Sequence, residues 1–575
     1  MTPVPKILRE YALLADGERG ALIGPRGEIV WLCAPRWDSG AVFTGLLGGE
    51  GRYTVRPADP WFVPGGFYED GSLIWRSRWR RSGGTVECRE ALALPGDSRR
   101  LVLLRRLHAV EGDARVIVEL DPRAGFDRWP MREITQEQGC WRARAGELYL
   151  RWSGCPRARH SGAGLAATLS IPAGGQHDLV LEISDRPLDG PPPDPDRAWE
   201  VTEHQWRAQV PRLDGVVGSR DARLAYAVQR GLTSAQGGLV AAATTSLPER
   251  ARTGRNYDYR YTWVRDQCYA GHALATAGDD DLFDRHVDWI TERLLADGPG
   301  LRPVYTVDGG PVPPERELEG LPGYPGGFPK TGNNAAEQFQ LDALGEALLL
   351  LAAAGGLDRL DNTRWQAVQT AVAAIEKRWT EADAGVWELD DEHWAHSRLI
   401  CAASLRNIAA AGPGRAEAAS WSALADAIVA DAARDCVHPT GRWQRSPADG
   451  RVDAALLLPM VRGAVPAEDP RNAATLDAVR DELTEDGYVY RFRHDRRPLH
   501  AAEGAFLLCG FFTSLACLRR GERAEARAWF ERSRSACGPP GLYSEEYDVV
   551  QRQLRGNLPQ AFVHALMLET ACELT

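Results

Sequence analysis

The chain has 575 residues, more than one hydrophobic core usually supports, so two or more domains are expected. Hydrophobic residues make up 44% of the sequence and charged residues 26%, proportions typical of a folded globular protein. The formal net charge of −11, without any run of Lys or Arg, argues against a nucleic-acid partner.

Targeting signals and cysteine usage bear on the cellular compartment. Residues 1–20 have no basic segment followed by an apolar one, so no secretory signal is expected. No apolar run reaches the roughly 18 residues that a membrane span needs. The 11 cysteines are scattered, odd in number and without CxxC pairs, which predicts reduced thiols and neither disulfides nor a zinc site. We therefore expect a cytoplasmic protein with a small soluble substrate.

The first part of the chain has the pattern of short β-strands. Apolar and polar residues alternate in segments separated by Gly, Pro and Asp, as in half-buried antiparallel strands. The predicted strands include 28–33, 51–56, 85–94, 101–110, 114–120 and 177–184. So many short strands predict an antiparallel β-sandwich over residues 1–186. The proline-rich segment 187–197 begins a linker with one helix, which we place at 187–217.

From residue 218 to 575 the hydrophobic period becomes helical. The predicted helices are 220–236, 265–278, 280–296, 334–354, 362–380, 396–411, 414–434, 451–462, 468–484, 503–518, 521–535 and 558–573. Long loops precede every second helix: 240–264, 298–333, 381–395, 436–450, 485–502 and 537–557. Six helical hairpins closed into a ring, with these loops on one rim, predict an (α/α)6 barrel.

Three of these loops combine aromatic and charged residues. Residues 255–270 contain Tyr257, Tyr259, Tyr261, Trp263, Arg265 and Asp266. Aromatic faces stack on the C–H surfaces of sugars while charged groups hydrogen-bond hydroxyls, so the segment suits carbohydrate binding. An ordinary core segment with an Arg265–Asp266 ion pair fits the same residues.

The loop at 383–397 places Trp387 beside Glu388 ahead of a helix. A large apolar ring desolvates a carboxyl group, which favours its protonated form and suits general-acid work. Acidic residues that complement a helix dipole are the simpler explanation. His393 and His396 lack an HExxH pattern, so they predict no metal site.

A second carboxylate is offered by the segment 539–550, as Glu545 or its neighbour Glu546, framed by Tyr543 and Tyr547. Glycoside hydrolysis requires two carboxylates, although acidic pairs also arise by chance in a chain with 79 acidic residues. The chain has no phosphate loop, dinucleotide fingerprint or nucleophile elbow, so no cofactor is expected.

Several motifs in a fixed order resemble a known family. They lie at 11–39, 244–249 (TTSLPE), 256–266 (NYDYRYTWVRD), 332–346, 385–388 (GVWE), 503–511, 543–548 (YSEEYD) and 556–562 (GNLPQAF). Together they resemble bacterial members of glycoside hydrolase family 15, the family of glucoamylase, glucodextranase and trehalase. The resemblance implies a β-sandwich followed by an (α/α)6 barrel.

The resemblance also implies roles for individual residues. By similarity Glu388 is the general acid and Glu545 the general base of an inverting, exo-acting hydrolase. Substrate-binding positions are implied for Tyr259, Trp263, Arg265, Asp266, Trp387, Glu546 and Tyr547. The expected substrate is a small α-glucoside: a malto- or isomalto-oligosaccharide, or trehalose.

The chain departs from the family pattern at three places. Asp390 replaces a common arginine, residues 323–333 lack another, and Tyr257 replaces a common tryptophan. An anion beside Glu388 would disfavour ionisation of that carboxyl if the two groups were close. We expect the first two of these changes to alter the preference for the leaving group. A non-catalytic sugar-binding or regulatory protein on the same barrel is the alternative hypothesis, and the sequence does not reveal an oligomeric state.

Overall fold

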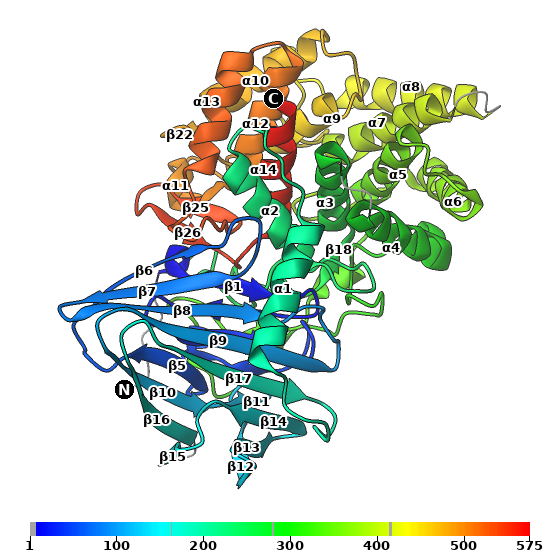
Figure 1. The fold of residues 1–575 in the computed structure, drawn as a ribbon. Helices are drawn as coiled ribbons and strands as arrows, with labels where there is room; N and C mark the ends of the chain where they lie inside the picture. Colours follow the sequence, from blue (N-terminus) through cyan, green and yellow to red (C-terminus); the bar gives the residue numbers. More distant parts are fainter. Residues whose placement is uncertain (1–6, 163, 279–280, 413–416) are drawn as a thin grey trace.

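Strands occupy the first part of the chain and helices the rest (Figure 1). The computed structural model describes residues 7–162, 164–278, 281–412 and 417–575. Parts of two predicted helices, residue 280 and residues 414–416, lie outside the described residues.

Two antiparallel sheets form the N-terminal part. Within the described residues, the first sheet has eight strands: β1 (Ala12–Ala15), β2 (Gly20–Ile23), β3 (Glu28–Cys33), β5 (Arg52–Pro57), β10 (Ala114–Asp121), β16 (Gly164–Ile171) and β15 (Arg159–Ser161) in that order, with β4 (Ala41–Phe43) paired to β3. The second has nine, in the order β11 (Arg123–Ala124), β12 (Trp129–Glu137), β13 (Cys140–Ala145), β14 (Leu148–Ser153), β17 (Gln176–Ser184), β9 (Arg100–Glu111), β8 (Gly84–Leu92), β7 (Trp75–Arg81) and β6 (Val63–Tyr68).

The two sheets pack face to face through their apolar side chains. In β5 the residues alternate between buried and half-buried, as expected for a strand with one face on the core. Trp152 of β14 meets Tyr53 of β5 edge-on, with ring centroids 6.3 Å apart, and donates its indole N–H to the Tyr53 hydroxyl at 3.3 Å. The predicted antiparallel β-sandwich is confirmed.

Helix α1 (Pro195–Gln209) follows the proline-rich segment and packs on the outer side of the nine-stranded sheet, against β9 and β17 (Figure 1). The Asp194 carboxylate caps it by accepting from the Arg197 N–H at 2.9 Å, and Pro195 occupies the first helical turn. The guanidinium of Arg89 lies 4.4 Å from the centroid of the buried Trp199 ring. This contact ties the helix to the sheet.

The remaining helices form two concentric rings. The inner ring, among the described residues, contains α3 (Val264–Ala277), α5 (Leu341–Gly356), α7 (Ala395–Ala411), α9 (Leu457–Val461), α12 (Leu507–Arg519) and α14 (Ala561–Glu573). Each contacts the next, and α14 returns to contact α3, which closes the ring. The outer helices are α2 (Ser219–Leu232), α4 (Asp281–Asp297), α6 (Asn362–Arg378), α8 (Ala418–Asp435), α10 (Pro470–Glu482) and α13 (Arg523–Arg534).

Burial explains why the two rings differ. Nearly all residues of α5, α12 and α14 are buried, as expected for helices that are apolar on every side. Outer helices such as α8 and α13 bury one stripe and expose the other. The predicted (α/α)6 barrel is confirmed. None of the described helices is long and apolar enough to cross a membrane.

Several predicted helices begin later than expected. The one predicted at 451–462 begins at Leu457, after a 3-10 turn at Ala454–Leu456. Residues 334–337 form a 3-10 turn capped by Asn333, and α5 starts at Leu341 instead of residue 334. The predicted helix at 503–518 begins at Leu507 because β24 (Ala505–Phe506) pairs with β25 (Glu546–Asp548).

Further short elements lie in the loops. They are α11 (Leu499–Ala502), β18 (Thr262–Trp263) paired with β19 (Val304–Tyr305), β20 (Arg316–Glu317) with β21 (Lys330–Thr331), β22 (Thr484–Glu485) with β23 (Tyr488–Val489), and β26 (Gln553–Arg555) with β25. Since every long loop precedes an inner helix, the loops gather at the rim where the inner helices begin.

Candidate active site

The loops before the inner helices line a cavity of about 750 Å³. Its walls come from five of the six long loops, so residues distant in sequence meet there. Seven lining residues are among the predicted catalytic and substrate-binding residues: Tyr259, Trp263, Arg265, Asp266, Trp387, Glu388 and Glu545. The volume falls in the range of about 300–1,000 Å³ found for small-molecule sites.

Glu388 lies at the turn before α7 and is half-buried. Its Oε1 atom accepts a hydrogen bond from the indole N–H of Trp263 at 2.8 Å and one from the Arg265 guanidinium at 3.2 Å. The backbone of Glu388 has φ +56°, in the left-handed region that non-glycine residues rarely adopt. Such strain costs on the order of 1–3 kcal/mol and concentrates at functional sites.

The charged neighbour of Glu388 is a cation. The Arg265 guanidinium also donates to Gln340 Oε1 at 3.1 Å and lies 3.7 Å from Asp342 Oδ2, so three side chains fix its position. Asp390 is exposed and is not among the residues that line the cavity. Arg265 therefore places a positive charge beside Glu388, although the arginine of the family pattern is replaced by Asp390.

Glu545 immediately precedes β25 and is buried. The Tyr259 hydroxyl lies 3.2 Å from each of its carboxylate oxygens and donates to them. Burial first, and then the nearby carboxylates Glu249 and Glu546, raise the pKa of Glu545 well above its usual value; Arg491 and the Tyr259 hydroxyl oppose this shift. The group is thus poised to take up a proton.

One short segment supplies contacts to both carboxylates. The Tyr259 and Trp263 rings meet edge-on with centroids 5.4 Å apart, between Glu545 on one side and Glu388 on the other. Asp266 follows in the first turn of α3, where burial raises its pKa to about 7, Arg265 opposing and Glu388 adding to the shift.

Trp387 lines the cavity from the loop that carries Glu388. Its indole N–H donates to Asp453 at 2.9 Å, and its ring meets Phe506 edge-on at 5.2 Å. Asp453 in turn accepts a hydrogen bond from the Arg445 guanidinium at 3.1 Å. These contacts hold the ring in one orientation beside Glu388.

The structure does not bring Glu546 and Tyr547 together with the other predicted substrate-binding residues, since neither side chain lines the cavity. Glu546 is fully buried on the other side of the strand, where it accepts from the Gly504 N–H at 2.8 Å and lies 3.5 Å from Arg255. Successive side chains of a strand point to opposite faces, so Glu545 and Glu546 cannot both face the cavity. Tyr547 packs on the Tyr488 ring at 4.6 Å.

Sequence reasoning missed a set of charged residues behind Glu545. Arg255 lies 2.6 Å from Glu249, and His494 lies 2.7 Å from Glu503. Burial acts to raise the pKa of Glu503, but Arg491 and His494 outweigh it and lower that pKa to about 2. Glu249 ends the motif TTSLPE and Glu503 begins EGAFLLCGF, so their motif membership was the available signal.

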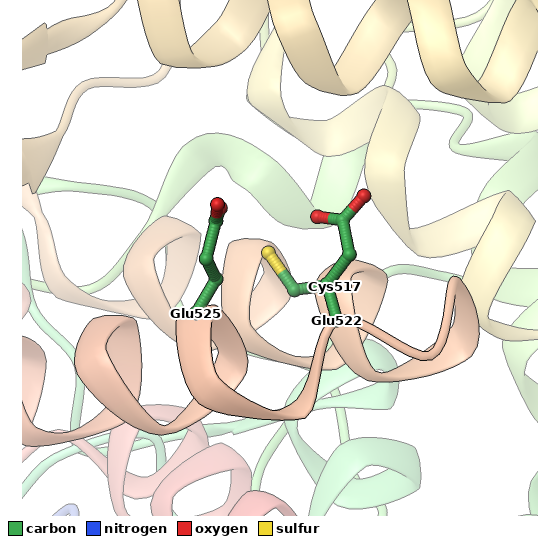
Figure 2. Close-up of side chains that lie close together, drawn as sticks. All are labelled: Cys517, Glu522 and Glu525. Atoms are coloured by element: carbon green, nitrogen blue, oxygen red, sulfur yellow. The ribbon is translucent and has the colours of Figure 1, made fainter.

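One group of potential metal ligands is found among the described residues: Cys517, Glu522 and Glu525 (Figure 2). The Arg480 guanidinium lies between them, 3.0 Å from the Cys517 sulfur and 2.7 Å from Glu525, and also contacts Glu522. A cation thus already satisfies these groups, and they lie away from the cavity.

Two carboxylates from separate loops, framed by aromatic rings in one cavity, define the site of a glycoside hydrolase. Residues 222–572 match the family model of glycosyl hydrolases family 15, and residues 3–148 match that of a trehalase-like N-terminal domain. The chain belongs to glycosyl hydrolases family 15.

Relatives match nearly the whole chain. A trehalase of Mycobacterium tuberculosis is 31% identical over 98% of this chain and 89% of its own length. A trehalase of Mycolicibacterium smegmatis is 30% identical over 98% and 91%. A bacterial glucoamylase complexed with acarbose superposes with a TM-score of 0.71 at 14% identity, covering 100% of this chain and 95% of that one. The last match concerns the fold alone.

Proposed function

We propose that this α-glucoside hydrolase cleaves trehalose by an exo-acting, inverting mechanism. The observation that carries the choice of substrate is the extent of the similarity to trehalases, which covers 98% of the chain and so includes both the sandwich and the barrel. The match of residues 3–148 to a trehalase-like N-terminal domain supports the same choice.

Glu388 is the proposed general acid and Glu545 the proposed general base. Glu388 would transfer its proton to the glycosidic oxygen as the C1–O bond breaks. Glu545 would remove a proton from a water that attacks C1 from the opposite face, which inverts the anomeric carbon. The buried position of Glu545 and its neighbouring carboxylates favour proton uptake, which supports the role of a base.

The other lining residues would bind the terminal glucose. Arg265 and Asp266 offer charged groups to its hydroxyls, and Tyr259, Trp263 and Trp387 offer aromatic surface to its C–H faces. The presence of both carboxylates in one cavity supports an enzyme over a non-catalytic sugar-binding protein. All eleven cysteines are unpaired, which supports a reducing compartment, and we propose the cytoplasm.

Hydrolysis of trehalose, maltose, isomaltose and maltotriose, followed by proton NMR from the first seconds, tests both parts. An inverting enzyme releases β-glucose from the cleaved unit of trehalose, while the leaving unit keeps its α configuration. Equal initial amounts of the two anomers are expected. Initial α-glucose alone would contradict inversion. Faster turnover of maltose or isomaltose would contradict the choice of trehalose but leave the hydrolase intact.

A further inference from the structure

Arg260 lies next to Tyr259, in the segment whose Tyr259 and Trp263 side chains donate to Glu545 and Glu388. Its own side chain points away from the cavity. Tyr257 and Tyr259 line the cavity, whereas Asp258 and Arg260 are buried on the opposite side. This alternation is that of an extended chain. The segment is paired along one edge, since the carbonyls of Tyr257 and Tyr259 accept from the N–H groups of Ser246 and Ala242 at 2.9 Å.

The Arg260 guanidinium joins the barrel to the β-sandwich. Toward the sandwich it donates to the Ser39 carbonyl at 2.8 Å and to the Trp37 carbonyl at 3.3 Å, and it lies 5.3 Å from the centroid of the Phe126 ring. Toward the barrel it donates to both oxygens of Asp258, at 2.8 and 2.7 Å.

A second loop that lines the cavity, residues 298–333, is held by the same Arg260 guanidinium. Arg260 donates to the Thr331 hydroxyl at 2.9 Å, and Thr331 and the Gly332 N–H both donate to Asp258 at 3.1 Å. The next residue, Asn333, lines the cavity. The fully buried Arg260–Asp258 pair therefore fixes two cavity loops to the sandwich at once.

We infer that Arg260 is a positioning residue through which the β-sandwich sets Tyr259 and Trp263 against the two catalytic carboxylates. The sandwich is thus part of the catalytic machinery, although none of its described residues lines the cavity. This inference depends on the roles proposed for Glu388 and Glu545. A misplacement of about 1 Å transmitted to a reacting group lowers rates by roughly 100-fold, so a small rearrangement here has a large effect.

The chain offers a matched control in Arg105, which is also fully buried. Arg105 pairs with Glu90 at 3.0 Å, donates to the carbonyls of Tyr53 and Gly27 at 3.3 and 2.6 Å, and lies 4.7 Å from the Tyr53 ring centroid. All these partners lie within the sandwich. The two arginines have nearly the same surroundings, but only Arg260 adjoins the cavity loops.

The test compares Arg260→Lys with Arg105→Lys in the full chain. Lysine keeps a positive charge opposite the buried carboxylate, so no charge is left uncompensated. It lacks the planar guanidinium with its several N–H donors. Both variants should lower the melting temperature. At a temperature where both are folded, R260K should lower kcat on trehalose, or on the best α-glucoside of the wild type, by roughly 10- to 100-fold. R105K should change it less than threefold.

The pH dependence of kcat/KM is a second measurement, which a mere loss of stability would not change. Tyr259 stabilises ionised Glu545, so a displaced Tyr259 should shift the acidic limb of kcat/KM to higher pH in R260K and not in R105K. Equal losses of kcat in the two variants, or an unshifted limb in R260K, would overturn the inference.

If R260K fails to fold, the double variant Asp258→Asn with Arg260→Gln removes both charges and takes its place. Inactive E388Q and E545Q with an unaffected R260K would leave the proposed function standing and refute only this inference.

Discussion

The indole N–H of Trp263 donates to Glu388 at 2.8 Å, across 125 residues of sequence. Four residues before Trp263, the Tyr259 hydroxyl donates to Glu545, which lies 286 residues further along the chain. Because one short segment contacts both proposed catalytic groups, its position governs how far apart they stand. Inverting hydrolysis needs room for a water between the two carboxyl groups, at a separation of roughly 6.5–9.5 Å.

Replacing either carboxylate should abolish most turnover. E388Q and E545Q should each lower kcat/KM on trehalose by about 10²–10⁴-fold, the usual contribution of general acid–base catalysis. Glutamine has nearly the same shape, so the melting temperature should change little. Asp391→Asn, an exposed change on the loop of Glu388, serves as the control and should retain activity.

A fluoride leaving group separates the two roles, because it departs without a proton. On α-glucosyl fluoride E388Q should recover much of its lost rate and E545Q should not. The reverse pattern would show that the proposed acid and base are exchanged.

Removing the Tyr259 hydroxyl should change the pH dependence of the reaction. Burial, Glu249 and Glu546 raise the pKa of Glu545, and the Tyr259 hydroxyl lowers it. A base acts when ionised, so the rate rises with pH through this pKa. Tyr259→Phe removes the opposing hydrogen bond, so the acidic limb of kcat/KM should move to higher pH, with about tenfold lower activity on that limb.

The Tyr257→Phe variant is the control for this shift. Tyr257 stacks on Tyr259 with ring centroids 6.3 Å apart. Removing the Tyr257 hydroxyl should leave the pH of the acidic limb of kcat/KM unchanged, even if the rate itself changes. A limb that stays in place in Y259F would show that the hydrogen bond does not influence the proposed base.

Arg265→Lys tests the pairing beside the proposed acid. The guanidinium reaches Glu388 and Gln340 at once, which a lysine ammonium cannot reproduce in the same geometry. A hydrogen bond to a charged group contributes about 1.5–3 kcal/mol, so kcat/KM on trehalose should fall by roughly 10- to 100-fold. Steady-state kinetics checks this, with unchanged thermal unfolding as the condition. A loss below threefold would contradict the pairing.

Local periodicity was enough to predict the helices, because the inner and outer rings have distinct apolar patterns. It failed at residues 503–506 and 334–340, where partners distant in sequence decide the backbone. Residues 505–506 read as the start of a helix but pair with the strand that follows Glu545. Nothing in the local pattern around Phe506 indicates that partner.

The candidate site shows the same limit. Glu545 and Glu546 are adjacent and equally acidic, and only the motif resemblance distinguished them in the sequence. The strand geometry separates them, since Glu546 lies behind the strand with Arg255. Contacts such as Tyr259 to Glu545 join opposite ends of the barrel sequence, and composition carries no record of them.

The interior of the barrel predicts a pH-dependent stability. Glu346 of α5 is fully buried, and within the described part of the chain neither of its carboxylate oxygens has a hydrogen-bond partner. Burial, with a contribution from Asp342, raises its pKa from 4.5 to about 8, although Arg462 and Arg265 oppose the shift. An acid whose pKa is raised by folding favours the folded state below 4.5, and this contribution is lost as the pH rises toward 8.

Glu346→Gln should therefore stabilise the protein at pH 8 relative to the wild type and have little effect at pH 5. One pKa unit corresponds to about 1.4 kcal/mol, so the difference between the two pH values is on the order of 3 kcal/mol. Denaturant unfolding of both proteins at pH 5 and 8 measures it. Glu569→Gln is the contrast: Glu569 is equally buried but paired with Arg462 at 2.9 Å, so its loss should destabilise at both pH values. An E346Q protein with the same pH dependence as the wild type would mean that Glu346 stays ionised inside the barrel.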